Sequence, residues 1–249
     1  MDFFDANVFV GSPVQGGYEP AATAAELLPV MDRIGTSQAL VWHIAQIDCS
    51  AQDGNGLVAG VVAANPRLVG CWAILPPQTG EVIREDFFLE MKRNGIAALR
   101  AFPDMHKYLL TRTTFGSFMD EVSEHRIPLL LSLERHATWP MVYSFLSEYP
   151  NLTCILCDVG IWGQDRRFWP LLESYPNVRV ETSCVSIEAM GLEATVKRFG
   201  AERLVFGSSF PTRYPEAAAI DLMRADISDE EKQMIAGDNL RRIMAEVRL

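Results

Sequence analysis

The sequence predicts a single (β/α)8 barrel from three observations. The chain has 249 residues, close to the roughly 250 residues that are typical of one such barrel. Eight short runs rich in Val, Ile and Leu alternate with longer amphipathic stretches. The runs are mostly continuous in apolar residues rather than alternating, as expected for parallel strands covered by helices on both faces. A strand followed by a helix, repeated eight times, indicates a closed barrel or a doubly wound sheet, and the length and count favour the barrel.

The eight predicted strands are spaced so that a helix fits between most neighbours. They are Phe3–Val10, Gln38–Ile44, Leu68–Leu75, Ile96–Phe102, Pro128–Leu133, Leu152–Val159, Val178–Ser183 and Leu204–Gly207. In a barrel of this kind the active site lies at the carboxyl ends of the strands. Polar side chains at these ends are therefore the candidate functional residues.

Residues typical of helix ends mark the stretches between the strands. Hydroxyl residues suited to N-caps begin four of them, two in the Ser/Thr-x-x-Glu pattern of a capping box. These residues are Thr23, Thr138, Ser186 and Ser228, with Glu26 and Glu231 completing the two boxes. Gly200 suits the end of the helix predicted from Ser186. The stretch 45–65, which contains three glycines, is predicted to be the least regular part of the chain.

The composition is that of one globular domain, residues 1–249. Hydrophobic residues make up 49% and charged residues 22%, and no linker or low-complexity tract divides the chain. The net charge of −10 opposes binding to nucleic acid or to an anionic membrane surface. Local arginines can still bind an anionic small molecule, which is the partner class we expect, and a homo-oligomer is compatible with the sequence.

The cysteines predict reduced thiols. Five are spread along the chain, and this odd count, with no signal peptide at the start, indicates a cytoplasmic protein. Cys154 and Cys157 have the spacing of a C-x-x-C motif. Residues three apart on a strand face opposite sides of the sheet, so we predict neither a redox pair nor a zinc site there.

Several segments resemble the amidohydrolase-related family of metal-dependent hydrolases. The clearest are Phe199–Pro211 and Ile235–Arg242, and the likeness extends to Asp5, Gly95–Arg100 and Asn177–Ser183 in the order that the family has. The resemblance implies a TIM barrel. Family members usually hold Zn²⁺ or a similar ion, which lowers the pKa of bound water toward ~7 so that hydroxide attacks a carbonyl.

The residues at the family's metal-ligand positions differ in this chain. The family has two histidines on the first strand, one each on the fifth and sixth strands, and an aspartate on the eighth. The corresponding residues here are Asn7, Phe9, Ser132 or its neighbour Leu133, Asp158 and Ser209. Since zinc normally takes at least three good N, S or carboxylate ligands, we expect no tightly bound catalytic transition metal. Asp5 and Asp158 could hold Mg²⁺, Ca²⁺ or Zn²⁺ weakly with bound waters.

Two aspartates are the predicted catalytic residues. Asp158 ends the sixth strand and is expected to face the barrel mouth, where burial would raise the pKa of its carboxyl and suit proton transfer. Asp5 shares that mouth, and the two carboxyls could divide acid and base roles. The alternatives are a cap on a loop amide for Asp158 and a hydrogen bond to a neighbouring strand end for Asp5.

Six residues are predicted to bind substrate. They are Arg100, His43, Asn7, Ser132, Ser209 and His136. Arg100 could grip a substrate carboxylate or pair with Asp5 or Asp158, and His43 could exchange protons near neutral pH or be structural. Ser209 could be a small wall residue, and His136 could lie in a solvated loop. Glu181 is a candidate for a buried ion pair.

Three functions are compatible with these residues. The first is hydrolysis of a small carboxylated ester, lactone or amide without a catalytic metal. Asp158 and Asp5 would transfer protons, while Arg100 and His43 would bind or polarise the substrate. The second is a non-catalytic relative that binds a ligand. The third is a lyase such as a decarboxylase, which in this family generally uses the metal.

Overall fold

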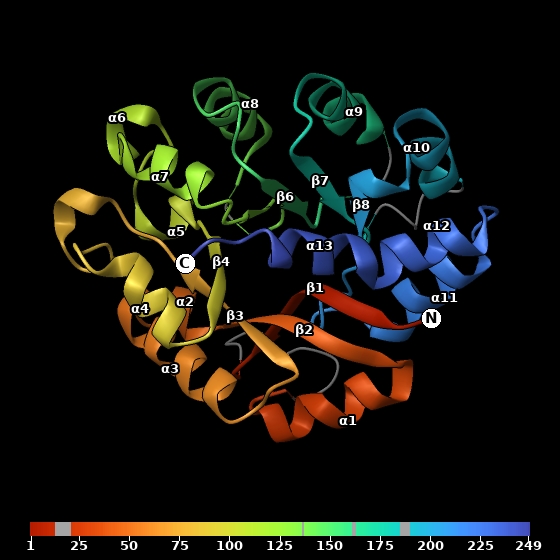
Figure 1. Ribbon diagram of the computed structural model, residues 1–249, viewed down its shortest axis with the longest axis horizontal. Coiled ribbons are helices and arrows are strands. Elements are labelled where there is room, and N and C mark those ends of the chain that lie inside the picture. The colour runs from red at the N-terminus through yellow and green to blue at the C-terminus, as the bar shows by residue number, and fades with distance from the viewer. Residues whose placement is uncertain (13–20, 136, 161–162, 185–189) are drawn as a thin grey trace.

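The computed structural model describes residues 1–12, 21–135, 137–160, 163–184 and 190–249. Eight parallel strands form one sheet in chain order (Figure 1), which confirms the predicted (β/α)8 barrel. They are β1 (Phe3–Val10), β2 (Thr36–His43), β3 (Leu68–Ala73), β4 (Ile96–Arg100), β5 (Leu129–Ser132), β6 (Cys154–Cys157), β7 (Val178–Glu181) and β8 (Leu204–Val205). Each overlaps one predicted apolar run.

The sheet closes between β1 and the segment after β8. The N–H of Ala6 donates to the carbonyl of Phe206 at 2.9 Å, and that of Phe9 donates to the carbonyl of Phe210 at 3.1 Å. Val8 and Phe210 form a parallel bridge. The first and last strand ends are therefore neighbours, and their side chains share the barrel mouth.

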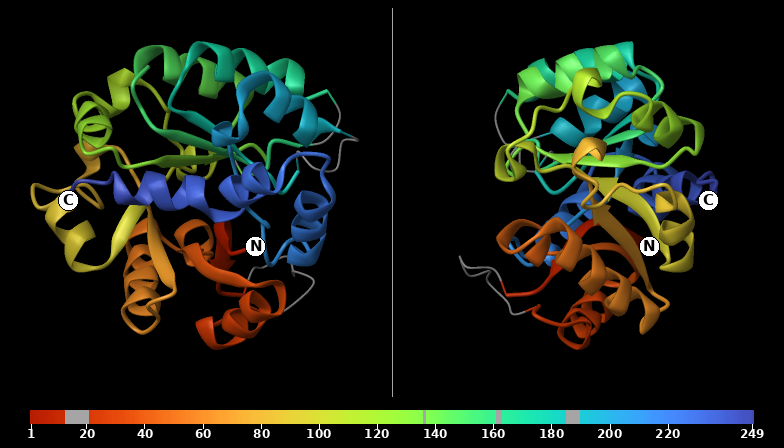
Figure 2. Two further views of the ribbon diagram at one scale, coloured as in Figure 1. Left: turned by 45° about the vertical axis from the view of Figure 1, so that its right-hand side comes forward. Right: turned by 90° about the vertical axis from the view of Figure 1, so that its left-hand side faces the viewer.

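Helices cover the outside of the strands, as two further views show (Figure 2). They are α1 (Ala24–Ile34), α2 (Ala45–Asp48), α3 (Ala51–Ala63), α4 (Phe87–Arg93), α5 (Pro103–His106), α6 (Arg112–Phe115), α7 (Phe118–Glu124), α8 (Trp139–Glu148), α9 (Asp165–Ser174), α10 (Gly191–Phe199), α11 (Pro215–Arg224), α12 (Asp229–Gln233) and α13 (Asn239–Ala245). The π-helix η4 (Met234–Asp238) joins the last two.

Three of the predicted helix starts are confirmed. Thr23 and Ser228 precede α1 and α12 in capping boxes, and the Thr138 hydroxyl accepts the N–H of Met141 at the start of α8. Gly200 follows α10 as predicted. The predicted start at Ser186 lies outside the described residues.

The expectation that the stretch 45–65 is irregular is wrong, because most of it forms α2 and α3, and Gly54 serves the packing of these helices. A Cβ at Gly54 in α3 would lie 2.4 Å from the backbone nitrogen of Gln46 in α2. The buried amide of Gln46 in turn donates to Asn55 Oδ1 at 2.7 Å and to the carbonyl of Cys71 at 3.0 Å. Glycine at position 54 thus permits the close approach of α2 and α3, which could not be predicted from composition alone.

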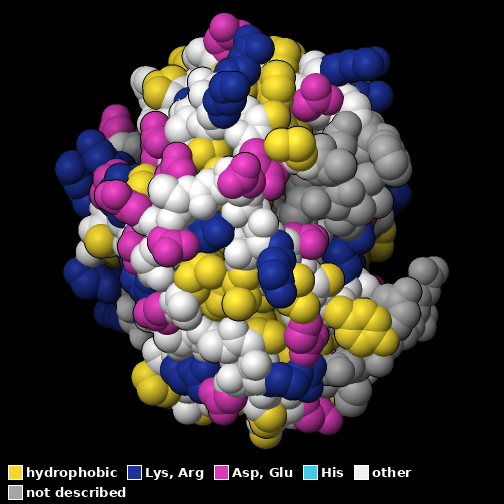
Figure 3. All heavy atoms as spheres, turned by 90° about the vertical axis from the view of Figure 1, so that its right-hand side faces the viewer, with side chains coloured by type: hydrophobic (Ala, Val, Ile, Leu, Met, Phe, Trp, Pro, Cys, Tyr) yellow, Lys and Arg dark blue, Asp and Glu magenta, His cyan; other side chains and the backbone are white. Residues whose placement is uncertain are grey.

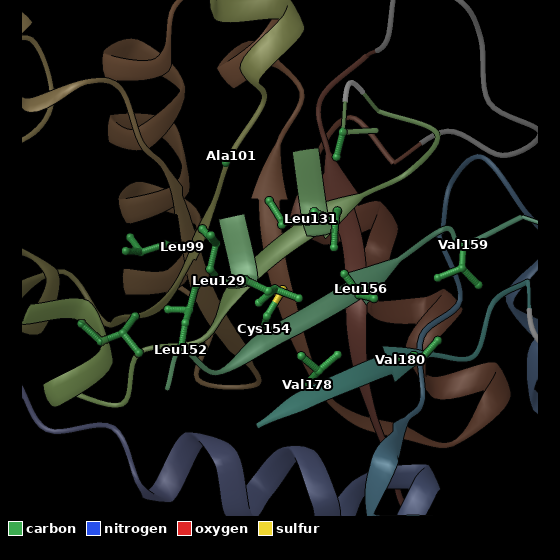
Figure 4. Packing of buried hydrophobic residues seen from close by; sticks show 14 of the residues in the cluster. Leu99, Ala101, Leu129, Leu131, Leu152, Cys154, Leu156, Val159, Val178 and Val180 are labelled. Carbon is green, nitrogen blue, oxygen red and sulfur yellow. The ribbon is translucent and has the colours of Figure 1, made fainter. Parts of the chain in front are cut away.

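The apolar side chains form separate layers inside and outside the barrel. Leu129, Leu131, Leu156 and Val178 point from the strands toward the outer helices (Figure 4). The interior is filled by a second cluster, which includes Phe4, Leu40, Cys71, Ala98, Leu130, Ile155, Cys157 and Val205. Cys154 belongs to the outer cluster and Cys157 to the inner one, so the prediction that they face opposite sides is confirmed.

The C-terminal helix α13 covers the end of the barrel where the strands begin. Leu240 and Ile243 join the interior cluster, and the Asn239 amide donates to the carbonyls of Ala201 and Leu204 just before and within β8. The opposite end, where the strands finish, carries the polar side chains described below.

Acidic and basic side chains are interspersed on the face shown in Figure 3, with apolar patches between them. None of the described helices is both long and apolar enough to cross a bilayer.

The packing of α3 gives a matched pair of substitutions. Gly54→Ala should destabilise the protein by about 2 kcal/mol, because the new methyl group meets backbone atoms. Gly56 lies in the same helix and a Cβ there meets nothing within 4 Å, so Gly56→Ala should stabilise by roughly 0.5–1 kcal/mol through helix propensity. Urea unfolding of both variants tests this, and equal effects would contradict the packing.

Candidate active site

A bulge in β1 turns Asn7 into the barrel. Asp5 is opposite Ala39 of β2 and Val8 is opposite Val41, so three steps on β1 match two on β2. Phe4 and Phe9 both belong to the interior cluster although they are five residues apart, whereas Val8 faces outward. An extra residue of this kind re-aims the side chains that follow it, and here it brings Asn7 to the centre of the mouth.

The carboxylate of Asp158 is the centre of the candidate site. It directly follows β6 and is 1% exposed. Its Oδ1 accepts hydrogen bonds from Asn7 Nδ2 at 2.9 Å and Ser209 Oγ at 2.7 Å, and its Oδ2 accepts one from Ser132 Oγ at 2.5 Å. Four predicted site residues from well-separated parts of the chain therefore meet, and Ser132 rather than Leu133 reaches the site.

Asp158 and its partners Asn7, Ser132 and Ser209 form the Asp158 group, and Arg100 contacts this group through Asn7. Its Nη2 donates to Asn7 Oδ1 at 2.6 Å and lies 3.7 Å from Cys157 Sγ. The guanidinium lies over the Trp42 ring, 5.0 Å from its centroid. Among the described residues, Arg100 makes no ion pair with Asp5 or Asp158, which were its predicted alternative partners.

The Arg100 guanidinium retains unused hydrogen-bonding capacity. The residue is 1% exposed, yet Nε and Nη1 have no hydrogen-bond partner within the described part of the chain. Unsatisfied buried N–H groups on a cation are costly. This is the feature expected of an arginine that binds an anionic ligand.

Two strand-end residues have backbone conformations that L-residues seldom adopt. The φ angles of Asp158 and Ser209 are 50° and 56°. Both residues contribute directly to the hydrogen-bonded group, and backbone strain of this kind concentrates at functional sites. The Ser209 hydroxyl is also 3.2 Å from Thr212 Oγ1, in the turn that follows it.

Asp5 joins β1 to the segment after β8. Its Oδ1 accepts the backbone N–H groups of Asn7 at 2.9 Å and Ser208 at 3.0 Å. Burial raises the pKa of Asp5 to about 6, although these hydrogen bonds oppose the shift. This contact is the strand-end hydrogen bond that was the alternative to a catalytic role for Asp5.

Glu181 is a second buried carboxyl beside Asp158. It ends β7 and accepts the Asp158 N–H at 3.1 Å, the Ser183 hydroxyl at 3.0 Å and Asn7 Nδ2 at 3.4 Å. Burial first, and then the negative charge of Asp158, raise the pKa of Glu181. A Cβ at Gly207 would lie 2.2 Å from Glu181 Cγ, so glycine is required where Glu181 packs. Among the residues that the structure describes, the partners of Glu181 are hydrogen-bond donors, and none is the cation of the predicted ion pair.

Of the two predicted histidines, His43 does not join the Asp158 group in the described structure. His43 ends β2, is half-buried, and its Nδ1 accepts the Ala45 N–H at 3.0 Å. Burial lowers the pKa of His43, so the ring is neutral at neutral pH. Within the described ranges it makes no hydrogen bond to Asp158 or Arg100. His136 lies outside the described residues.

Arg135, in the loop after β5, is a residue of the mouth that sequence analysis missed. Its backbone N–H donates to Ser132 Oγ at 3.1 Å. Its guanidinium lies 4.9 Å from the Phe9 ring centroid and 5.4 Å from that of Trp42.

A cavity of about 570 Å³ opens beside Asp158, and the residues that line it include Asp158, Ala137 and Gln164. This volume suits a small molecule.

The fold and the site together define a TIM barrel with a polar centre at the carboxyl ends of its strands. The sequence profile of the amidohydrolase family matches residues 4–244, and the chain belongs to that family. No protein of curated function matches the sequence.

Several solved structures share this fold. An uncharacterized TIM-barrel protein, Bb4693, from Bordetella bronchiseptica has a TM-score of 0.76 at 13% identity, covering 99% of each chain. A 2,6-dihydroxybenzoate decarboxylase from Rhizobium has a TM-score of 0.75 at 16% identity, covering 98% of this chain and 99% of the other. A proposed 2-pyrone-4,6-dicarboxylic acid hydrolase from Pseudomonas putida has a TM-score of 0.74 at 16% identity, covering 98% and 97%. At such identities the likeness establishes the fold alone.

The burial of Asp5 predicts a pH-dependent stability difference. Because its pKa is raised from 3.8 to about 6, the folded protein holds this proton more tightly than the unfolded chain. The Asp5 contribution to stability therefore falls as pH rises from ~4 to ~6, by about 3 kcal/mol, and stays constant above. Asp5→Asn keeps the acceptor oxygen and removes the charge.

The measurement is urea unfolding of the wild type and Asp5→Asn between pH 4 and pH 7.5. The variant should gain stability relative to the wild type as pH rises through this window. A stability difference that does not change with pH would show that Asp5 is not a buried, titrating carboxyl.

Proposed function

We propose that this amidohydrolase family member hydrolyses a small carboxylated ester, lactone or amide, and that it does so without a resident transition metal. The observation that carries the proposal is the convergence of Asn7, Ser132 and Ser209 on Asp158, beside the unsatisfied guanidinium of Arg100. The three hydrogen bonds hold Asp158 in place as a proton acceptor. The unsatisfied N–H groups of Arg100 provide a binding point for an anion.

The donor set at this position does not suit a divalent transition metal. Zinc normally takes at least three His, Cys or carboxylate ligands, and no such group of three occurs among the described residues. The amide nitrogen of Asn7 and the hydroxyls of Ser132 and Ser209 donate to Asp158, while Asn7 Oδ1 accepts from Arg100. The oxygens that could bind a cation therefore already take part in hydrogen bonds. The positively charged guanidinium of Arg100 also contacts one of them, Asn7 Oδ1.

In the proposed reaction each residue has a specific task. Arg100 binds the substrate carboxylate through its unused N–H groups. Asp158 accepts a proton from water as the water oxygen bonds to the carbonyl carbon, and it returns that proton to the leaving oxygen or nitrogen. Asn7, Ser132 and Ser209 fix the orientation of the carboxylate. Asp5 and Glu181 position Asn7 and the backbone of Asp158 through hydrogen bonds.

A ligand-binding protein without catalysis is the second candidate. It is favoured by the three hydrogen bonds that Asp158 accepts, since they occupy the carboxylate oxygens that would have to accept a proton from water. A metal-assisted decarboxylase has less support, because the donor set does not suit the metal. The likeness to the Rhizobium decarboxylase concerns the fold.

The test is hydrolysis of a panel of carboxylated lactones, esters and amides in the presence of EDTA. We expect turnover that EDTA leaves unchanged, and a loss of roughly 10²- to 10⁴-fold in kcat/KM for Asp158→Asn. Asp86→Asn, at an exposed position, is the matched control and should retain full activity. Thermal unfolding of both variants checks that they are folded.

Other outcomes would replace the proposal. Saturable binding without turnover identifies the ligand-binding protein. Activity that EDTA abolishes and Zn²⁺ or Mn²⁺ restores identifies a metalloenzyme, and release of carbon dioxide identifies a lyase.

A further inference from the structure

Apolar side chains form much of the wall of the cavity beside Asp158. They come from the loops after β5 and β6 and from the start of α8, and include Leu133, Ala137, Trp139 and Val159. A polar group of a ligand loses its water in such surroundings, so it must find a hydrogen-bond partner on the protein. The few polar atoms of this wall therefore decide which ligand groups are accepted.

Most polar side chains of the wall already have partners within the protein. The carboxylate of Asp158 accepts three hydrogen bonds, and Glu134 pairs with Arg213 at 2.6 Å. The Thr138 hydroxyl accepts the backbone N–H of Met141 at the start of α8. These groups hold the walls of the cavity together.

The side-chain amide of Gln164 differs from these groups. Its Oε1 is shielded from solvent, and it accepts no hydrogen bond within the described part of the chain. Gln164 stands at the N-cap of α9, yet its side chain makes no capping hydrogen bond, whereas the residues usual at an N-cap bond to the helix. A buried acceptor without a donor costs free energy. A donor supplied by a ligand would offset that cost.

The Gln164 amide lies against the backbone that leads away from the candidate base. Gly160 is two residues after Asp158, and a Cβ there would lie 3.4 Å from Gln164 Nε2 and 3.6 Å from its Cδ. Asp158 and Gln164 also line the same cavity. One small ligand can therefore contact the candidate base and the amide at the same time.

The three substrate types of the proposed function differ in the hydrogen that Gln164 lacks. A secondary amide has an N–H group next to its carbonyl, whereas an ester or a lactone has an oxygen there that only accepts hydrogen bonds. An N–H group directed at Gln164 Oε1 would satisfy both atoms. An ester oxygen in the same place would leave two acceptors facing each other, which is unfavourable away from water.

We propose that Gln164 is a specificity-determining residue that accepts a hydrogen bond from an N–H group of the ligand, and that the substrates of this site are secondary amides rather than esters or lactones. This inference rests on the proposed function in that Asp158 acts on the carbonyl of the same ligand. It adds a requirement for a donor hydrogen, which the contacts of Asp158 do not impose.

The experiment compares three ligands that differ at one atom. Each has one carboxylate and one benzoyl group, and the linking atom is N–H in N-benzoylglycine, N-methyl in N-benzoyl-N-methylglycine and oxygen in O-benzoylglycolate. Binding is measured immediately after mixing by quenching of tryptophan fluorescence, since Trp139 lines the cavity, and turnover is measured separately by release of benzoate. The wild type should bind N-benzoylglycine about tenfold more tightly than the other two.

Two substitutions at Gln164 test its role as an acceptor. Gln164→Met, which keeps the length of the side chain, should weaken binding of N-benzoylglycine about tenfold and leave the other two ligands within about twofold. Gln164→Glu still accepts hydrogen bonds but has no N–H to donate. It should keep the preference for N-benzoylglycine, even where its added charge weakens the binding of all three carboxylates.

Two further variants control for folding and for the substitution itself. Gln164→Leu also lacks an acceptor and should behave like Gln164→Met, and thermal unfolding identifies the variants that are folded. Gln52→Met changes an exposed glutamine of α3 that does not line this cavity. It is the matched control and should change the binding of none of the ligands.

The inference is overturned if the wild type does not prefer N-benzoylglycine, if none of the three ligands binds saturably, if Gln164→Met weakens all three equally, or if Gln164→Glu loses the preference. These results are distinguishable from failure of the proposed function. A preference for N–H that depends on Gln164, without release of benzoate from any ligand, would retain the role of Gln164 and exclude the hydrolase. Hydrolysis of O-benzoylglycolate with no preference for N–H would do the reverse.

Discussion

The carboxylate of Asp158 is buried, and a buried carboxylate is stable only when hydrogen bonds or opposite charges replace the water it has lost. Its partners come from the bulge in β1, the end of β5 and the turn after β8. These segments meet only when the barrel closes. The same contacts therefore join the two ends of the sheet and hold the candidate base. The structure of the mouth and the stability of the barrel both depend on these hydrogen bonds to Asp158.

Within the described residues, Arg100 contacts the carboxyls of the mouth through an intermediary rather than by a direct ion pair. Asn7 lies between Arg100 and the two carboxyls of Asp158 and Glu181, and its amide has both the acceptor and the donors that this requires. A histidine at this position could not bridge these groups in the same way. The arginines, held by aromatic rings, retain N–H groups for a ligand. This arrangement supports the proposal that the site binds an anion next to a fixed carboxylate.

Much of this could be predicted from sequence because parallel strands bring their carboxyl ends together. That rule places Arg100, Ser132 and Asp158 in one mouth, and the resemblance to the family adds Asn7 and Ser209. Three features could not be predicted. The β1 bulge has no recognisable pattern in the sequence of its strand, and the location of Arg135 depends on a loop. Gly54 of α3 looks like a loop residue until its packing against α2 is known.

The most direct test of the central claim is the metal content of the purified protein. The chain is produced in medium supplied with Zn²⁺, Mn²⁺ and Fe²⁺, and elemental analysis gives the metal bound per chain. If hydrogen-bond donors and Arg100 have taken the place of a cation around Asp158, metal should be far below one ion per chain. A content near one ion per chain that is lost in Asp158→Asn would contradict the account, since Asp158 would then be a metal ligand.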